Sequence, residues 1–183
     1  MMPPIYTIGH STHDLPTFAA LLQASGIERL VDIRTVPRSR TNPQFNRDTL
    51  PEALAPYGIA YEHLAALGGL RGKSKTVGPE INGFWENDSF HHYADYALTD
   101  EFRKGLDTLL ARAQAQRCAI MCSEAVWWRC HRRIVSDYLI ARKVPVFHIM
   151  GLGHVDEASL TRGAVIQPDD TVLYPPAVEQ AGR

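Results

Sequence analysis

The chain has 183 residues, of which 45% are hydrophobic, and its formal net charge at pH 7 is −1. A chain of this length can bury a core without help from disulfides, so we expect a single α/β domain over residues 1–183. The near balance of acidic and basic residues excludes a strong overall attraction to nucleic acid or to an anionic membrane. Three cysteines, no secretory signal and no run of about twenty apolar residues predict a cytoplasmic protein with reduced thiols and no membrane partner.

The first part of the chain alternates short apolar runs with segments of helical periodicity. Strands are expected at 5–8, 29–33 and 59–64, and helices at 15–25 and 49–57. The segment 68–92 contains glycine, proline, lysine, asparagine and aspartate but little periodicity. It is therefore expected to form a long loop or lid inserted in the domain.

The second part continues the alternation. Helices are expected at 100–114 and 130–143, with strands at 118–122 and 144–149. Residues 156–183 are expected to form a C-terminal tail that packs on the domain, with a short edge strand at 171–174. The alternation predicts a three-layer α/β/α fold, Rossmann-like or flavodoxin-like, with a mainly parallel sheet of about five strands.

Polar residues follow the predicted strands, at the edge of the sheet where parallel strands end. In open sheets of this kind, ligands bind outside the carboxyl ends of the strands. The sequence therefore predicts that five strand ends converge on one site, whose candidate residues include His10, Ser11, Arg34, Arg38, Ser39, Gly69, Arg71, Cys122 and Glu124.

Reactive residue types are densest in the segment 122–133. Cys130 is expected at or just before the start of a helix, where the helix dipole favours an anion. Three arginines, at 129, 132 and 133, act in the same direction and would acidify this thiol.

This segment predicts a nucleophile and a proton carrier. Cys122 or Cys130 would attack the substrate, and Glu124 or His131 would transfer protons. Because neighbouring residues of a helix point in different directions, we expect Cys130 and His131 to face different groups. The alternative without catalysis is that the thiols pack as small apolar groups.

Basic residues gather in the strand-end loops of this near-neutral chain, which indicates an anionic ligand. The guanidinium group suits phosphate or carboxylate, so we expect a nucleotide or a nucleic-acid end. The expected anion-binding residues are Arg34, Arg38, Arg71 and Arg132, with His10, Ser11, Ser39 and Gly69 orienting the ligand. The alternative to anion binding is that these arginines form ion pairs on a solvated surface. Residues 151–156 do not complete a dinucleotide fingerprint, so no cofactor is assigned.

Several of these motifs resemble the bacterial and archaeal domain-of-unknown-function family 488. The resemblance spans positions 5–150 and depends on 7–11 (Thr-Ile-Gly-His-Ser), 32–39, 67–71 and Cys122-x-Glu124 followed by Cys130-His131-Arg132. Members of the family usually read Asp-Val-Arg where this chain has Asp-Ile-Arg at 32–34. The family name leaves the activity open, so the resemblance implies no particular reaction. Some members of the family carry a DNA-repair label.

Three functional hypotheses follow from the sequence. The first is a cytoplasmic enzyme, a cysteine- and carboxylate-dependent transferase or hydrolase, acting on a phosphate-bearing substrate. The second is a non-catalytic module that binds a nucleotide or a single strand, with Trp127 and Trp128 as a stacking platform. The third is a metal-dependent hydrolase or metal-binding protein, whose candidate ligands Cys122, Cys130, His131 and His10 lack the spacing of a structural zinc site.

Overall fold

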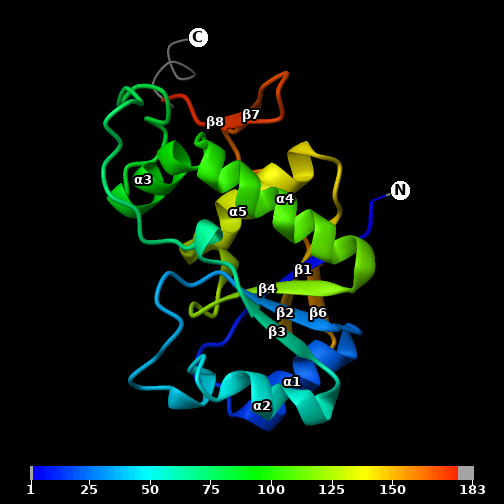
Figure 1. The fold of residues 1–183 in the computed structure, drawn as a ribbon. Coiled ribbons are helices and arrows are strands. Elements are labelled where there is room, and N and C mark those ends of the chain that lie inside the picture. Colours follow the sequence, from blue (N-terminus) through cyan, green and yellow to red (C-terminus); the bar gives the residue numbers. More distant parts are fainter. Residues whose placement is uncertain (1, 177–183) are drawn as a thin grey trace.

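The computed structural model describes residues 2–176, which form a six-stranded sheet between two layers of helices (Figure 1). The sheet order is β3-β2-β4-β1-β5-β6. The strands are β1 (Ile5–Gly9), β2 (Arg29–Asp32), β3 (Ala60–His63), β4 (Cys118–Cys122), β5 (Val146–Gly151) and β6 (His154–Glu157). The first five are parallel, and β6 is antiparallel to β5. The predicted three-layer α/β fold with a mainly parallel sheet is confirmed.

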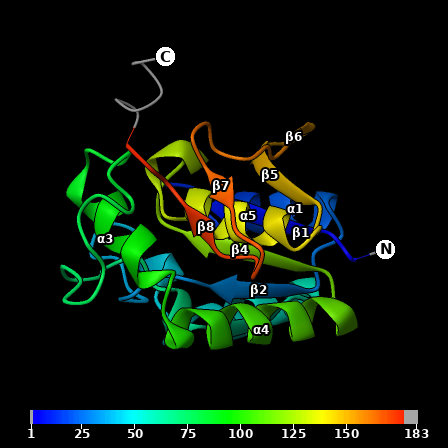
Figure 2. The same ribbon diagram turned by 90° about the horizontal axis from the view of Figure 1, so that it is seen from above.

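The helices cover both faces of the sheet, as Figures 1 and 2 show. One face carries α1 (Leu15–Ala24) and α2 (Leu50–Leu54), and the other carries α3 (Asp88–Tyr96), α4 (Asp100–Ala115) and α5 (Arg132–Ala141). Each face has its own apolar core: Leu22 packs with Met121 on the first, and Leu109 with Ile120 on the second. The buried strand β4 contributes to both cores, which explains its continuous apolar sequence.

The chain leaves neighbouring strands toward opposite faces of the sheet. The strand β4 lies between β1 and β2, which lead into α1 and α2 on one face, whereas β4 leads into α5 on the other. Such a change of direction opens a crevice beyond the carboxyl ends of the strands. The topology therefore places the ends of β1, β2 and β4 at the expected position of a ligand site.

Two expectations about the elements differ from the structure. The segment 68–92 is a loop only in part, because Asn87 caps α3, accepting from the Phe90 N–H at 3.2 Å. The edge strand expected at 171–174 does not join the main sheet. Instead, β8 (Val172–Leu173) pairs with β7 (Val165–Ile166) in a separate sheet, and the edges of the main sheet are β3 and β6. Of the expected tail, residues 177–183 lie outside the described part of the chain.

Candidate active site

A cavity of about 820 Å³ opens over the carboxyl ends of β1, β2 and β4. Its volume falls in the range of roughly 300–1,000 Å³ that small-molecule sites occupy. We call it the rim cavity. The predicted site residues that line it are His10, Ser11, Arg34, Arg38, Ser39, Gly69, Cys122, Glu124, Cys130 and His131. Of the predicted set, Arg71 and Arg132 are the two that do not.

The side chains of Cys130 and His131 contact each other beside the start of α5. Cys130 Sγ is 3.4 Å from His131 Nδ1. His131 Nε2 donates to the Ile33 carbonyl at 2.8 Å, so the neutral ring carries its proton on Nε2 and accepts from the thiol on Nδ1. The expectation that the two residues face different groups is therefore wrong. It treated both as helical, whereas Cys130 has an extended backbone (φ −129°, ψ 152°) and α5 begins at Arg132.

The two thiols of the cavity differ in acidity. Burial raises the pKa of Cys122 well above its ordinary value, and the neighbouring Cys130 raises it further. Burial also acts to raise the pKa of Cys130, but the contact with Cys122 and the charge of Arg132 outweigh it, and that pKa is lowered. The Arg132 backbone N–H lies 3.4 Å from Cys130 Sγ and supports the thiolate. Cys130 is thus the thiol that ionises more readily.

Arg132 lies completely buried rather than in the cavity wall. Its Nη1 donates to Thr7 Oγ1 at 3.1 Å and its Nη2 to the Glu124 carbonyl at 2.9 Å, while Nε has no partner within residues 2–176. None of the ion pairs in this part of the chain includes Arg132. A buried guanidinium is costly without a compensating anion. This placement favours negative charge on Cys130 and not the predicted contact with a substrate.

A chain of neutral groups continues from Arg132. The Thr7 hydroxyl, which accepts from Arg132, donates to His148 Nδ1 at 2.6 Å. Burial and then the charge of Arg132 lower the pKa of His148 to about 4. Trp127 stacks on this imidazole with ring centroids 4.7 Å apart, and the exposed Trp128 packs edge-on against Trp127. Neither tryptophan lines the rim cavity, so the pair offers no stacking platform for a ligand bound there.

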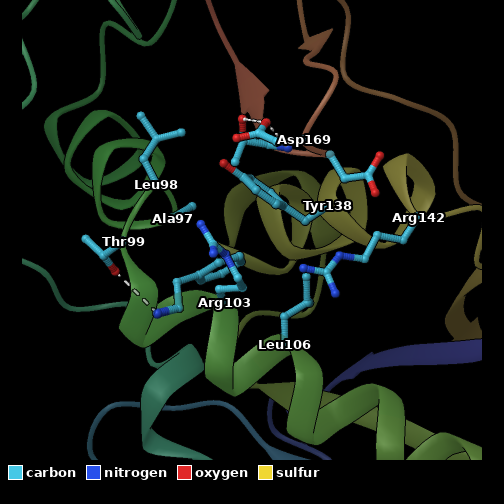
Figure 3. Close-up of a pocket in the computed structure, with 11 residues that line it drawn as sticks. Ala97, Leu98, Thr99, Arg103, Leu106, Tyr138, Arg142 and Asp169 are labelled. Atoms are coloured by element: carbon cyan, nitrogen blue, oxygen red, sulfur yellow. Dashed lines mark hydrogen bonds between the residues drawn. The ribbon is translucent and has the colours of Figure 1, made fainter.

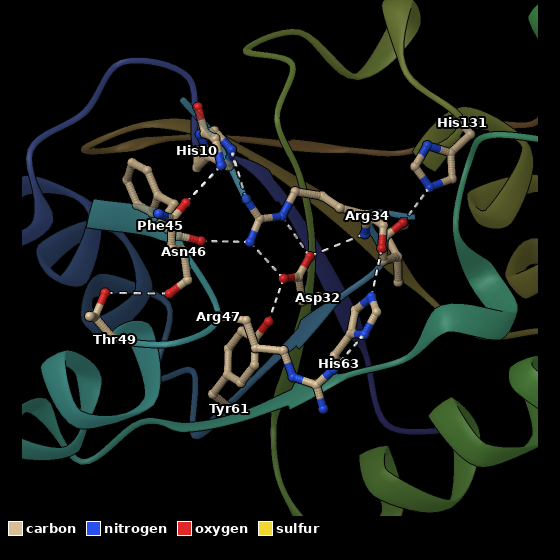
Figure 4. Close-up of polar contacts among 12 residues, drawn as sticks. His10, Asp32, Arg34, Phe45, Asn46, Arg47, Thr49, Tyr61, His63 and His131 are labelled. Carbon is tan, nitrogen blue, oxygen red and sulfur yellow. Dashed lines mark hydrogen bonds and ion pairs between the residues drawn. The ribbon is translucent and has the colours of Figure 1, made fainter. Parts of the chain in front are cut away.

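Arg34 is held against the cavity wall by Asp32 (Figure 4). Its Nε and Nη2 donate to the two carboxylate oxygens at 2.9 and 2.7 Å, and Nη2 also donates to the Phe45 carbonyl at 2.6 Å. Asp32 accepts a further hydrogen bond from the Tyr61 hydroxyl at 2.5 Å. Arg34 Nη1 faces His10 Nε2 at 3.4 Å. Most of the guanidinium is therefore used within the protein, and one N–H of Nη1 remains for a ligand.

The turn after β1 brings His10 and Ser11 to the cavity. Their backbone N–H groups donate to the carbonyls of Cys122 and Ser123 at 2.9 and 3.0 Å, which extends the pairing of β1 with β4. His10 Nδ1 donates to the Ser11 carbonyl at 2.9 Å, so Nε2 accepts from Arg34. Burial lowers the pKa of His10, so its ring is neutral at pH 7. Ser11 has a left-handed backbone (φ 48°), a conformation found at functional turns.

Three charged side chains face the rim cavity with no hydrogen-bond or ion-pair partner in residues 2–176. They are the exposed side chains of Arg38, Arg129 and Glu124. Because Asp32 neutralises Arg34, the cavity carries an excess of positive charge. This field favours an anionic ligand.

Arg71 lies outside the rim cavity and serves the loop that lines it. Its guanidinium lies 3.7 Å above the Tyr96 ring and donates to two carbonyls of the preceding turn at 3.0 and 2.7 Å. The loop in turn packs Gly69 against His131. A Cβ on Gly69 would lie 2.5 Å from His131 Nδ1, so this close approach requires glycine. The sequence predicted that Arg71 contacts the ligand. In the structure it instead holds the loop that lines the cavity.

Other groups of the site were not predicted. The Ile33 carbonyl orients His131, and a backbone atom leaves no signature in a sequence. Thr35 accepts from the Leu70 N–H at 2.8 Å and lines the cavity. Asn87, also in the cavity wall, carries a recognisable signal, since asparagine is a preferred N-cap residue.

A second hollow lies between α4, α5 and the turn before β8 (Figure 3). It holds about 10 Å³, which is about the space of one water molecule. Among residues 2–176, no three His, Cys, Asp or Glu side chains gather in a way that would hold a metal ion. The candidate ligands His10, Cys122, Cys130 and His131 therefore do not form such a group.

These observations define a class of protein: a three-layer α/β domain with two thiols and a histidine in a cationic cavity at its strand ends. Residues 14–139 match the family described as domain of unknown function DUF488, and the chain belongs to this family. Its motifs had predicted this membership. No curated protein and no solved structure matches the chain. Within residues 2–176, no helix combines the length and apolar character needed to cross a membrane.

Proposed function

We propose that this protein is an enzyme in which Cys130 attacks an anionic substrate bound in the rim cavity. The observation that carries the proposal is the 3.4 Å contact between Cys130 Sγ and His131 Nδ1, with His131 Nε2 fixed on the Ile33 carbonyl. In this geometry His131 takes the thiol proton and returns it to the leaving group. The buried charge of Arg132 favours the thiolate throughout.

The charges of the cavity support an anionic substrate. The guanidinium groups of Arg38 and Arg129 have no partner among residues 2–176, and Arg34 offers one further N–H. Such groups suit phosphate or carboxylate, and we infer a phosphate-bearing or otherwise acidic molecule. Glu124, exposed at the same cavity, is a second group that can carry protons. A reducing compartment such as the cytoplasm would keep the three free cysteines in this state.

The test is the pH dependence of alkylation by iodoacetamide at each cysteine of the folded protein, read by mass spectrometry. Cys130 is expected to react with a midpoint below the ordinary thiol pKa of about 8.5. The buried Cys118, whose pKa burial raises to about 11, is the internal control and should react only at higher pH. If Cys130 stays inert until the protein unfolds, the nucleophile is rejected and the non-catalytic binding module is favoured.

A further inference from the structure

Cys122 is a second thiol of the rim cavity, and attack by Cys130 alone does not require it. Cys122 ends β4, and Cys130 follows the short helical turn Trp127–Arg129. Both line the cavity as free thiols, and each lies close enough to shift the pKa of the other. The third thiol, Cys118, begins β4 and does not line the cavity. The fold thus brings together two of the three thiols, eight positions apart in sequence.

Two neighbouring thiols of unequal acidity suit thiol–disulfide exchange. In that chemistry one thiolate attacks a disulfide, and a second thiol then resolves the mixed disulfide. Cys130 has the surroundings of the attacking sulfur, since the Arg132 backbone N–H lies 3.4 Å from it. The Cys122 thiol instead donates toward the Glu124 carbonyl at 3.7 Å, a contact that keeps its proton. The cavity adds Arg38 and Arg129, whose charges suit acidic groups on the substrate.

We propose that the substrate is a disulfide bearing carboxylate or phosphate groups, and that Cys122 is the resolving thiol. The inference rests on the proposed function, because Cys130 must be the nucleophile. Cys130 thiolate attacks one substrate sulfur, the substrate S–S bond breaks, and the released thiolate takes the proton held by His131. Cys122 sulfur then attacks Cys130 sulfur, and its proton goes to the second leaving thiolate. The substrate is reduced to two thiols, the Cys122–Cys130 disulfide forms, and an external dithiol reduces it again.

The first experiment follows the products. The reduced protein is mixed with dithiodipropionate, a disulfide with two carboxylates, and the protein and released thiol are measured by mass spectrometry. We expect two thiols released for each protein and a disulfide that maps to Cys122 and Cys130. The variant C122S should stop at a mixed disulfide on Cys130, with one thiol released. The matched control C118S should behave like the unsubstituted protein.

The second experiment tests the charge of the substrate. The rate at Cys130 is compared for dithiodipropionate, for the neutral hydroxyethyl disulfide and for the cationic cystamine. The anionic disulfide is expected to react about tenfold faster than the neutral one, and cystamine to react slowest. In the double variant R38Q/R129Q the ratio of anionic to neutral rates should fall toward one. A preference for the neutral or the cationic disulfide would overturn the proposed substrate class.

The outcomes separate this inference from the proposed function. If iodoacetamide shows a Cys130 thiolate but the unsubstituted protein never forms the Cys122–Cys130 disulfide, the nucleophile stands and the disulfide substrate is rejected. If Cys130 is inert toward both reagents in the folded protein, both proposals fail. Because the disulfide is mapped in the unsubstituted protein, this result does not depend on the folding of C122S.

Discussion

Arg132 lies buried beside Cys130, and within residues 2–176 its guanidinium donates to two neutral groups, the Thr7 hydroxyl and the Glu124 carbonyl. Arg132→Met removes the charge at similar length, so the pKa of Cys130 is expected to rise by about one pH unit or more. Arg132→Lys keeps the charge and should cause a smaller change. The measurement is the pH midpoint of alkylation at Cys130, with circular dichroism as the check of folding. Equal midpoints for Arg132→Met and the unsubstituted protein would contradict the role of Arg132.

Gly69 packs closely against the ring of His131 and restricts its position. In Gly69→Ala the new Cβ would meet His131 Nδ1 at 2.5 Å, so the ring must shift from its present position beside Cys130. We expect alkylation of Cys130 near pH 7 to slow about tenfold, because a misplaced base is ineffective. Gly72→Ala is the matched control, since a Cβ there meets nothing within 4 Å. If both variants slow the reaction equally, the effect belongs to the loop and not to His131.

At the scale of single residues, the sequence predicts which residues lie near the cavity better than it predicts where their side chains point. The rule that sites form at strand ends grouped His10, Arg38 and Cys122, and all three line the rim cavity. It could not distinguish Arg129, which lines the cavity, from Arg132, which is buried beneath it. Where the Arg132 side chain points depends on the extended backbone of Cys130 before α5, and no local sequence pattern predicts that conformation.

Among the elements, β2 and β3 meet at the site through Asp32, which forms a buried ion pair with Arg34 and a hydrogen bond with Tyr61. Asp32 ends β2, accepts from Tyr61 of β3, and neutralises Arg34, whose side chain is 6% exposed. Asp32→Asn would leave the Arg34 charge buried and unpaired, so the free energy of unfolding should fall by about 3–5 kcal/mol. Tyr61→Phe removes one hydrogen bond and should cost about 1 kcal/mol. Urea unfolding measures both, and equal losses would contradict the ion-pair argument.

The elements that the sequence predicts well are those whose pattern reflects burial. The strand β4 is buried at every position, and its five apolar residues identify it. The edge strand β6 is exposed at every position, so hydrophobicity carries no signal, and only its pairing with β5 makes it a strand. The start of α3 was hidden in a loop-like composition, because its cap Asn87 resembles a turn residue.

The whole molecule has almost no net charge, yet its cavity is cationic and several of its histidines are buried and neutral. Burial lowers the pKa values of His10, His131 and His148 below their ordinary value. In the unfolded chain these rings regain a pKa of about 6.5. Below that pH the unfolded chain binds more protons than the folded protein, so stability must fall as the pH falls.

His148 gives the measurable part of this acid sensitivity, because its folded pKa is about 4. Between pH 6.5 and that value, it should add up to about 1.4 kcal/mol per pH unit to the loss of unfolding free energy, or up to about 3 kcal/mol in all. His148→Gln cannot be protonated and keeps an acceptor for Thr7, so its stability should decline less steeply. His154→Gln, at an exposed position of β6, is the control and should keep the original slope. The measurement is urea unfolding at several pH values, and parallel slopes for His148→Gln and the unsubstituted protein would show that burial of this imidazole does not limit acid stability.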